Sequence, residues 1–272
     1  MFQYALVEAL RSRGREAGCN LGFYRLHPDS MPFILDKVFP KVYLNDVEDN
    51  IFKNIDNRWR EIKNNEEMLK VFKKDLKKRF FYVEEDGKYD RNIFETENCT
   101  FVGYWQTEKY FLNIENKLKK IYTFENLESK LQDFGKYLSK NYVSVHIRRN
   151  DYLNHKMFST CSKEYYIRAI NYIKNQMTGM RFIFFSDDKE WVSENYKSKD
   201  MIVCDPGLFD NYQDWYDLYL MTVCRGNIIA NSSFSWWGAW LNHNPDSIVI
   251  APEKWFNGKK MPDIWCPKWV RM

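Results

Sequence analysis

The sequence predicts an α/β protein whose C-terminal half is built on a parallel sheet. Two observations predict this class. From about residue 141 onward, apolar segments of strand length alternate with segments that have apolar residues at helical spacing. Polar clusters follow three of these strands, where ligands bind in open parallel sheets. The 272 residues are enough for two modest domains, and the change of pattern places their boundary near residue 140.

Residues 1–140 are predicted to form a first domain. Its start, MFQYALVEALRSR at residues 1–13, has apolar residues at helical spacing and is followed by Gly14, which predicts an amphipathic helix. An α/β domain seldom begins on such a helix, so we expect this domain to lack its first strand. Residues 30–100 are polar and weakly patterned, with helical propensity around 66–78.

Residues 141–272 are predicted to form a second domain. Strands are expected at residues 142–147, 181–186, 201–204, 227–230 and 247–251. Helices are expected at residues 163–177, 215–224 and 236–242. Strands that are separated by helices imply a parallel sheet that is covered on both faces.

The composition argues against several classes of protein. The six cysteines include no C-x-x-C pair, which speaks against a zinc site and a compact disulfide framework, and the four histidines are dispersed. No apolar run reaches the length of a membrane span, and no signal peptide precedes the first helix. These features predict a reduced, cytoplasmic protein, with peripheral association with the inner face of the cytoplasmic membrane left open.

Nucleic-acid binding is a poor fit. The formal net charge is only +4, and the lysines within residues 73–78 have the spacing of a solvated helix face. Aromatic residues make up 18% of the chain, but they cluster in apolar runs rather than between exposed lysines. Nucleic acid is therefore not expected among the partners.

The most informative motif is HIRRND at residues 146–151, which follows the strand ending at Ile147. Two adjacent arginines are costly to bury unless an anion lies opposite them. A guanidinium donates two parallel hydrogen bonds and suits phosphate well, so Arg148 and Arg149 are candidates for binding a diphosphate. The alternative is a pair of surface arginines bonded to neighbouring carboxylates.

Two further polar clusters are SDD at residues 186–188 and NSSFS at residues 231–235. Serines and free N–H groups at the start of a helix hold phosphate oxygens, and carboxylates accept hydrogen bonds from a base edge or a ribose. Each cluster also has a structural reading, because serines cap helices and carboxylate pairs form turns and caps. Together with the arginines, the clusters predict a nucleotide-diphosphate pocket.

Metal and P-loop chemistry are not indicated. The sequence has no G-x-x-x-x-G-K-[ST] loop and no Asp-x-Asp triplet of the kind that clamps a metal in metal-dependent sugar transfer. Arginine charge in place of a divalent ion is the coherent interpretation, so no metal is expected.

These motifs resemble those of glycosyltransferase family 11, the α-1,2-fucosyltransferases. The His-x-Arg-Arg-x-Asp motif of that family stands at residues 146–151, and its serine–tryptophan block is NSSFSWWGAWL at residues 231–241. Other similar segments are FFSDDKEW (184–191), GYWQTEKYF (103–111), DLYLMTVC (217–224) and VIAPEKWF (249–256).

The resemblance implies a bacterial, GT-B-like enzyme with two Rossmann-type domains facing a cleft. Residues 1–140 would form the acceptor-side domain, and residues 141–272 the GDP-fucose-binding domain. The implied reaction is an inverting, metal-independent transfer of L-fucose from GDP-fucose to the 2-hydroxyl of a terminal galactoside. The implied partners are GDP-fucose and a galactoside acceptor glycan, and no cofactor is implied.

The resemblance also implies roles for the motif residues. Arg148 would bind the donor pyrophosphate and stabilise the departing GDP. An inverting transfer needs a base for the acceptor hydroxyl; Asp151 is the nearest candidate, and its alternative role is to orient an arginine. The other expected donor-binding residues support Arg148 or contact the phosphates, guanine or ribose: His146, Arg149, Asp187, Asp188, Asn231, Ser232, Ser233 and Ser235.

The start of the chain differs from the family pattern. In the family, Gly-Gly-Leu-Gly-Asn-Gln precedes the segment that stands here at residues 1–5, so the first strand and a phosphate-binding loop are expected to be missing. Either the start codon is assigned too late or the chain is truly truncated. A truncated chain would leave a sheet edge and an apolar face of the first helix uncovered, and a weakly active or inactive GDP-sugar-binding remnant is the alternative function. On the acceptor side, Gln106 and Glu108 are candidates only if their segment is a loop.

Overall fold

The computed structural model describes residues 1–29, 32–47, 57–58, 61–62, 65–77, 81–85, 87–125, 127, 134–135, 138–139, 141–205, 213–258 and 260–272. The chain forms two compact units. Unit 1 comprises residues 1–123 and 262–264, and unit 2 comprises residues 124–261 and 265–272. The chain thus enters unit 2 ahead of the boundary predicted near residue 140, and the roles expected of the two domains stay predictions.

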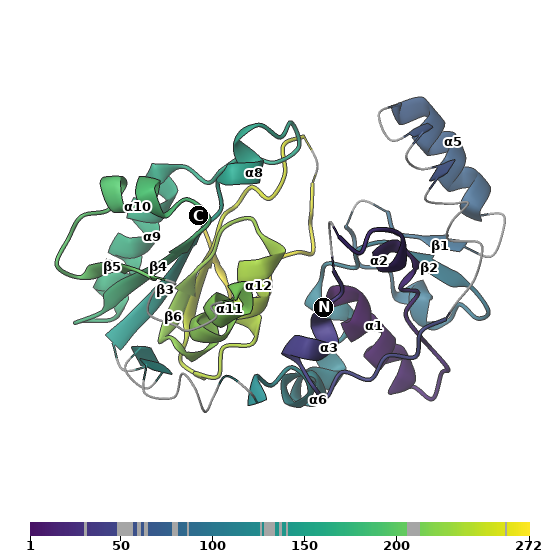
Figure 1. Ribbon diagram of the computed structural model, residues 1–272, viewed down its shortest axis with the longest axis horizontal. Coiled ribbons are helices and arrows are strands. Elements are labelled where there is room, and N and C mark those ends of the chain that lie inside the picture. The colour runs from purple at the N-terminus through teal and green to yellow at the C-terminus, as the bar shows by residue number, and fades with distance from the viewer. Residues whose placement is uncertain are drawn as a thin grey trace. The chain divides into compact units, whose positions relative to one another are not determined.

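Unit 2 contains a six-stranded sheet in which the neighbouring strands run parallel. Its strands are β3 (Tyr142–Ile147), β4 (Arg181–Ser186), β5 (Met201–Val203), β6 (Gly226–Ile228), β7 (Ile248–Ala251) and β8 (Val270–Arg271). Their order across the sheet is β5-β4-β3-β6-β7-β8 (Figure 1). The strand order therefore reverses between β3 and β6, as in doubly wound folds. The α/β class and the parallel sheet are confirmed, and β8 is a strand that the sequence pattern did not predict.

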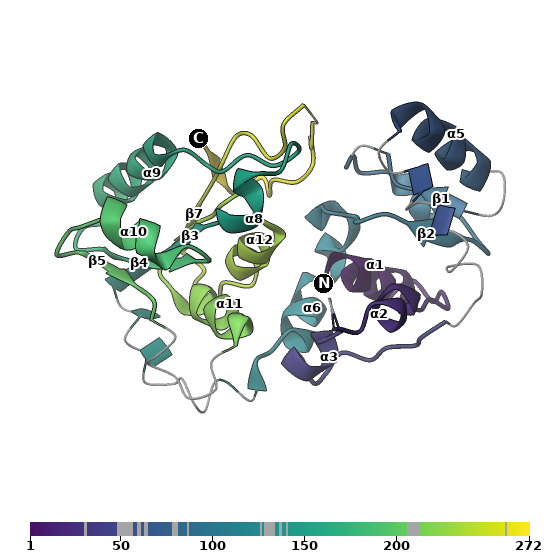
Figure 2. The ribbon, with the colours of Figure 1, turned by 45° about the horizontal axis from the view of Figure 1, so that its top comes forward.

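Helices cover both faces of this sheet (Figures 1 and 2). The helices of unit 2 are α8 (Asn150–Leu153), α9 (Lys163–Gln176), α10 (Lys189–Asn195), α11 (Asp214–Val223) and α12 (Ser233–Trp240). Val143, Val145 and Ile147 of β3 belong to the same buried core as Tyr166 of α9 and Val192 of α10. Because side chains alternate along a strand, Ser144 and His146 lie on the opposite face, towards α11 and α12.

A buried polar network fixes β6 against β3. The Asn227 amide donates to the Ser144 hydroxyl at 2.7 Å and to the Met221 carbonyl of α11 at 2.9 Å, while its oxygen accepts from Asn242 at 2.8 Å. A buried network with its hydrogen bonds satisfied specifies one arrangement of the groups it joins. It therefore sets where β3 and β6 end relative to each other.

Unit 1 has a smaller parallel sheet of two strands, β1 (Phe81–Val83) and β2 (Thr100–Val102), in its described residues. Its α-helices are α1 (Phe2–Arg11), α2 (Gly22–Leu26), α3 (Leu35–Val38), α5 (Glu66–Lys77) and α6 (Glu115–Ile121). Its 3-10 helices are η1 (Arg91–Phe94), η2 (Glu108–Tyr110) and η3 (Leu112–Ile114). A second Rossmann-type half, and with it the GT-B-like architecture, stays a prediction.

The first helix is buried around most of its circumference. The helix predicted at residues 1–13 is confirmed as α1, and its apolar residues are 8% exposed or less. The Phe2 ring lies 6.3 Å from the Phe111 ring, and the Tyr4 ring lies 6.0 Å from the Tyr122 ring. The expected uncovered face on this helix is therefore wrong, because aromatic residues further along the unit cover it.

In the ranges that the structure describes, no helix combines the length and the apolar character that a membrane span requires.

Candidate active site

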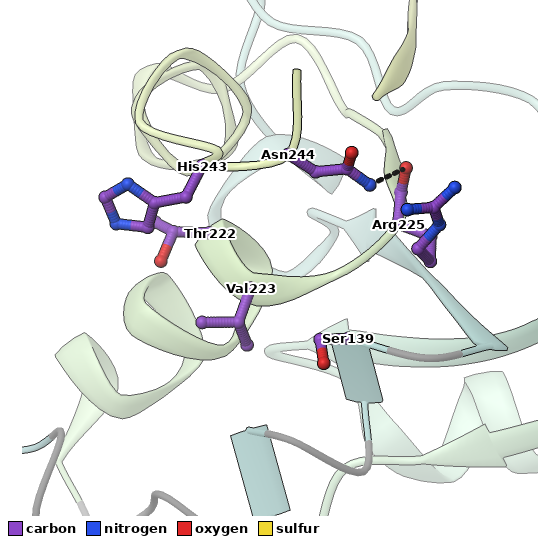
Figure 3. A pocket seen from close by; sticks show the side chains of 6 residues that line it. All are labelled: Ser139, Thr222, Val223, Arg225, His243 and Asn244. Carbon is purple, nitrogen blue, oxygen red and sulfur yellow. Dashed lines mark hydrogen bonds between the residues drawn. The ribbon is translucent and has the colours of Figure 1, made fainter. Parts of the chain in front are cut away.

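A cavity of about 280 Å³ lies in unit 2 at the amino ends of the parallel strands (Figure 3). It is lined by Ser139, Thr222, Val223, Arg225, His243 and Asn244. Ser139 precedes β3 and Arg225 directly precedes β6. The predicted site residues lie elsewhere, and ligands of open parallel sheets bind at the opposite rim.

The structure brings the three predicted clusters to that opposite, carboxyl rim. Arg148 follows β3, Asp187 follows β4, and Asn231 stands shortly after β6. β3 lies between β4 and β6, and the strand order reverses between β3 and β6. In doubly wound sheets, nucleotides bind at the carboxyl ends of the strands where the strand order reverses, so this rim is the expected place for a nucleotide sugar.

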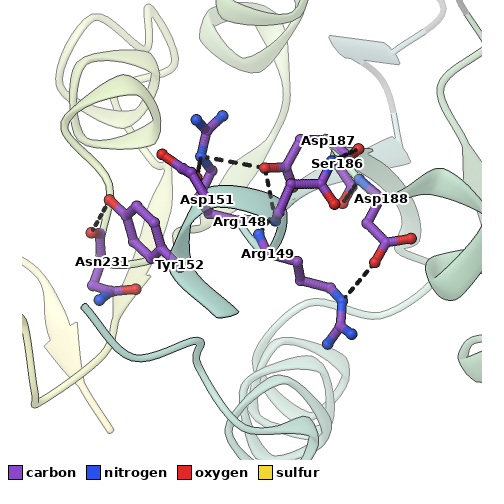
Figure 4. A network of polar contacts seen from close by, with 9 residues as sticks. Arg148, Arg149, Asp151, Tyr152, Ser186, Asp187, Asp188 and Asn231 are labelled. Carbon is purple, nitrogen blue, oxygen red and sulfur yellow. Dashed lines mark hydrogen bonds and ion pairs between the residues drawn. The ribbon is translucent and has the colours of Figure 1, made fainter. Parts of the chain in front are cut away.

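Arg148 is anchored by one edge of its guanidinium. Its Nε lies 2.8 Å from Asp151 Oδ1 and 3.3 Å from Asp187 Oδ2. Figure 4 shows its two terminal nitrogens directed away from both carboxylates. Burial opposes the charge of this group, but the hydrogen bond that it donates to Asp151 and the charges of both aspartates raise the pKa of Arg148 above its usual value. Arg148 therefore presents a permanently charged, oriented pair of donors.

Arg149 points to the other side of the loop (Figure 4). Its Nε donates to Asp188 Oδ2 at 2.9 Å, and its guanidinium carbon lies 3.7 Å from the centre of the Trp191 ring. Its side chain is only 17% exposed. An ion pair and a cation–π contact thus occupy this arginine, which is the structural alternative for a surface Arg-Arg pair.

Asp187 closes the turn that carries both arginines. Its carboxylate accepts from the backbone N–H of Arg149 at 2.9 Å and of Asn150 at 3.2 Å, in addition to the contact with Arg148 Nε. Its own carbonyl accepts from the Asn150 side chain at 2.6 Å. These bonds favour a positioning role for Asp187, whereas the sequence indicated a contact with guanine or ribose.

Asp188 begins α10. Its Oδ1 accepts from the backbone N–H of Trp191 at 3.2 Å as a helix N-cap, and its Oδ2 holds Arg149. The cap is the structural reading of a carboxylate pair after a strand. The predicted contact of Asp188 with the donor stays a prediction.

Among the arginines and aspartates at this rim, Asp151 has the most exposed side chain, at 58%. Oδ1 accepts from Arg148, while Oδ2 has no bond among the described residues. Asp151 therefore orients Arg148 through Oδ1, while the Oδ2 atom of Asp151 remains accessible.

His146 is buried under α12. It is 5% exposed, its ring lies 5.6 Å from the Phe234 ring, and its Nδ1 has no hydrogen-bond partner among the described residues. Burial, assisted by the charge of Arg148, lowers the pKa of His146 to about 3. The imidazole is therefore neutral at ordinary pH and adds no positive charge to the site.

Asn231 and Ser235 hold the third loop from inside. The Asn231 amide donates to the carbonyls of Ser159 at 3.0 Å and Trp255 at 2.9 Å, and its oxygen accepts from the Cys161 thiol at 3.4 Å. The fully buried Ser235 hydroxyl donates to the Ser232 carbonyl at 3.3 Å. Neither side chain is directed at solvent, which favours a positioning role for both.

Ser232 and Ser233 stand at the start of α12, which begins three residues earlier than the predicted helix near Trp236. Ser232 is the N-cap residue, but its hydroxyl makes no cap hydrogen bond, and Ser233 is exposed. The first N–H groups of a helix lack partners within the helix and attract anions. The chemistry of this helix start suits an anion, and the contact of Ser232 and Ser233 with the donor phosphates stays a prediction.

Tyr152 is a site residue that the sequence reasoning missed. Its hydroxyl donates to the Asn231 carbonyl at 3.2 Å, and its ring stacks on Phe158 with ring centres 4.5 Å apart. Burial raises the pKa of Tyr152 to about 12. It ties the loop after β3 to the loop after β6. In a chain with 18 tyrosines, its only sequence signal is that it directly follows Asp151.

The two acceptor-side candidates differ in their local structure. Gln106 lies in a loop, as required, whereas Glu108 begins η2 and is 8% exposed. Throughout the described residues, no three His, Cys, Asp or Glu side chains are grouped so that they could hold a metal ion.

Comparisons with known proteins agree with the motifs. The sequence profile described as glycosyl transferase family 11 matches residues 43–272. The chain is 40% identical over 181 residues to an α-1,2-colitosyltransferase of Escherichia coli, an alignment that covers 63% of this chain and 62% of that protein. It is 36% identical over 141 residues to the O-antigen biosynthesis glycosyltransferase WbnK of Escherichia coli, covering 48% and 45%.

More distant matches include human galactoside α-(1,2)-fucosyltransferase 1, which is 26% identical over 140 residues that cover 48% of this chain and 38% of that one. These alignments therefore span less than two thirds of the relatives' own lengths. A crystal structure of POFUT1 in complex with GDP-fucose aligns with a TM-score of 0.40 and 14% identity, over 58% of this chain and 55% of that chain.

Proposed function

Because the chain belongs to glycosyltransferase family 11, we propose that it transfers L-fucose from GDP-fucose to the 2-hydroxyl of a terminal galactoside, with inversion and without a metal. The observation that carries this proposal is the anchored guanidinium of Arg148 at the carboxyl rim, where the strand order reverses between β3 and β6. A fixed cation at this point of a doubly wound sheet suits the diphosphate of a nucleotide sugar.

The proposed chemistry is stabilisation of the leaving group. Negative charge develops on the diphosphate as the bond between the sugar and GDP stretches. The terminal nitrogens of Arg148 and the N–H groups at the start of α12, at Ser232 and Ser233, would stabilise that charge by donating hydrogen bonds to it. Two carboxylates already hold Arg148, so little reorganisation is needed during the reaction, which is the condition under which electrostatic stabilisation is most effective.

Asp151 serves this chemistry in one of two ways. Through Oδ1 it orients Arg148, as the 2.8 Å contact supports. Through Oδ2 it would accept the proton of the acceptor hydroxyl as a general base, provided that the acceptor lies within hydrogen-bond reach. The remaining predicted donor-binding residues either contact GDP directly or hold the three loops in place.

A second candidate is the transfer of colitose instead of fucose. It is favoured by the higher identity to an α-1,2-colitosyltransferase, 40%, than to the galactoside fucosyltransferases, 26%. The name of another relative, an O-antigen biosynthesis glycosyltransferase, supports a surface polysaccharide as the acceptor.

The test is a transfer reaction with defined donors and acceptor. The purified chain is incubated with lactose and either GDP-fucose or GDP-colitose, and the product is identified by mass spectrometry and by the anomeric signals in NMR. We expect an α-1,2-linked trisaccharide, at an undiminished rate in EDTA. Preference for GDP-colitose would decide for the second candidate.

Two other outcomes contradict the proposal. Binding of GDP-fucose in calorimetry without transfer to lactose or any other β-galactoside tested would identify a GDP-sugar-binding remnant. Loss of transfer in EDTA that Mg²⁺ or Mn²⁺ restores would overturn the metal-independent mechanism.

A further inference from the structure

Unit 1 contains a strained loop that no part of the donor chemistry uses. Trp105 follows β2 closely and has a φ of 56°, in the left-handed region that residues with a side chain rarely adopt. Its ring is only 2% exposed. Strain of this kind persists only where the surroundings hold it, and it concentrates at functional sites.

Glu84 holds the loop in this conformation. Its carboxylate accepts from the backbone N–H of Tyr104 at 2.7 Å and from that of Trp105 at 3.1 Å, one bond to each oxygen. Glu84 is itself fixed, because its N–H donates to the Val102 carbonyl at 2.9 Å. A Cβ atom on Gly103 would lie 2.4 Å from the Cβ of Glu84, so only glycine allows this close approach.

The buried ring of Trp105 holds the same loop from the other side. Trp105 meets the rings of Phe101 and Tyr110 edge-on, with centres 6.1 Å and 5.7 Å away. With the backbone clamped on one side and the indole packed on the other, the segment is rigid although it has no regular secondary structure.

Tyr104 lies in this clamped loop and is 72% exposed. Its side chain has no hydrogen bond or ring contact among the described residues, and the same holds for Gln106 on the far side of Trp105. The nearby cation Lys109 is bound to Asp263, so the loop offers no open positive charge to an anion. An exposed phenol on a clamped backbone, beside an amide, suits a neutral ligand that has an apolar face and hydroxyl groups.

We infer that Tyr104 is a stacking platform for the galactoside acceptor. The inference rests on the proposed function and deepens it, since it names the residue that meets the acceptor sugar. The apolar face of a pyranose carries C–H groups that pack on the electron-rich face of an aromatic ring, while a phenol or amide bonds to its hydroxyls. The clamp from Glu84 fixes the backbone of the platform in advance, so that only the Tyr104 side chain has to be ordered when the sugar binds.

The experiment uses lactose as the probe and compares Tyr104→Ala with Tyr43→Ala, a matched control because Tyr43 is also 72% exposed in unit 1. Lactose binding is measured by saturation-transfer NMR, and transfer from GDP-fucose is measured as separate KM values for lactose and for GDP-fucose. We expect Tyr104→Ala to raise the KM for lactose about tenfold and to weaken the NMR signal, with the KM for GDP-fucose unchanged. Tyr104→Phe should retain most of the binding.

The outcomes separate this inference from the proposed function. A wild-type protein that binds lactose through Tyr104 but transfers nothing to it contradicts the function and keeps the platform. A protein that transfers normally while Tyr104→Ala leaves lactose binding within twofold contradicts the platform alone. Equal losses in Tyr104→Ala and Tyr43→Ala also overturn it, as does a wild-type protein that binds no lactose.

Discussion

The two rims of the unit 2 sheet offer two different kinds of arginine. Arg225 lies at the amino rim beside a cavity of about 280 Å³, and its side chain has no bond among the described residues. Arg148 lies at the carboxyl rim and is held by two carboxylates. The cavity and the oriented charge of Arg148 thus lie at opposite rims. We therefore expect strand order and fixed charge to be better guides to the chemistry of this fold than the volume of a cavity.

The largest expected effect separates these two arginines directly. Arg148→Ala should lower kcat about 1,000-fold with GDP-fucose and lactose, because it removes preorganised charge from the leaving group. Arg225→Ala should leave kcat within about twofold, as expected of a surface substitution away from the site. Steady-state rates and circular dichroism of both variants check the effect. Similar losses in both would break the comparison between the rims.

The anchoring of Arg148 is tested at Asp187. Asp187→Ala removes the acceptor for two backbone N–H groups and one of the two carboxylates at Nε, so kcat should fall about 100-fold as the guanidinium loses its orientation. The control is Asp200→Ala, which removes a carboxylate paired with Lys174 just before β5, at the amino rim. A lower kcat with a nearly unchanged KM for lactose distinguishes lost positioning from general damage. Equal activity of the two variants would contradict the role of Asp187.

The burial of His146 at the carboxyl rim makes the stability of the protein depend on pH. Its pKa is about 3 in the folded protein and 6.5 in the unfolded chain, so the unfolded chain binds more protons between these values. Stability should therefore fall as the pH drops below 6.5, by at most about 1.4 kcal/mol per pH unit from this group. Urea unfolding at several pH values between 7 and 4 should show a shallower decline for His146→Phe. Parallel curves for variant and wild type would show that His146 titrates normally.

Arg149 should behave as a structural residue although it neighbours Arg148. Arg149→Ala removes the ion pair with Asp188 and the contact with the Trp191 ring, both partly exposed, and should cost about 1–2 kcal/mol of unfolding free energy. We expect kcat to fall less than tenfold, since this guanidinium is directed away from that of Arg148. A loss of activity equal to that of Arg148→Ala would assign both arginines to the diphosphate.

The smallest effect is expected at Tyr152. Tyr152→Phe keeps the ring on Phe158 but removes the hydrogen bond to the Asn231 carbonyl, which is worth about 1 kcal/mol. The two loops should then move more independently, and the KM for GDP-fucose should rise by about threefold to fivefold, in line with that energy. A KM that is unchanged within error would show that the two loops are held together by other contacts.

Much of unit 2 could be predicted because its signals are local. Strand-length apolar runs and helical spacing give β3, α9 and β4 almost to the residue, and the rule for open parallel sheets places the polar clusters at one rim. β8 escaped prediction because its two residues pair with a strand already known and have no pattern of their own.

The roles within the site could be predicted less well, because they depend on contacts across the sheet. Nothing in the order Arg148-Arg149 indicates that one guanidinium is open and the other lies on Trp191. Asp187 and Asp188 are adjacent, yet one closes the arginine turn and the other caps α10. Asp187, Asp188 and Arg149 thus make the structural contacts that were their alternatives, whereas the terminal nitrogens of Arg148 have no hydrogen bond among the described residues.

In unit 1, the packing of the first helix could not be predicted from the sequence. The family segment missing before residue 1 predicted an uncovered apolar face on the first helix, but α1 is covered by rings from residues more than 100 positions away. Long-range packing of this kind leaves no periodic signal, and the left-handed backbone at Trp105 could not be predicted from residue type either.

The pairing of β3 with β6 has a consequence for how the protein acquires its site. Ser144 and Asn227, which join the two strands, are separated by 83 positions in the chain. Closing so long a loop is slow, whereas helices and local turns form early in folding. The point at which the strand order reverses cannot form until β6 pairs with β3. Recovery of donor binding during refolding should therefore lag behind the return of helical circular dichroism, and nascent chains should be unable to hold the donor before Asn227 has been synthesised.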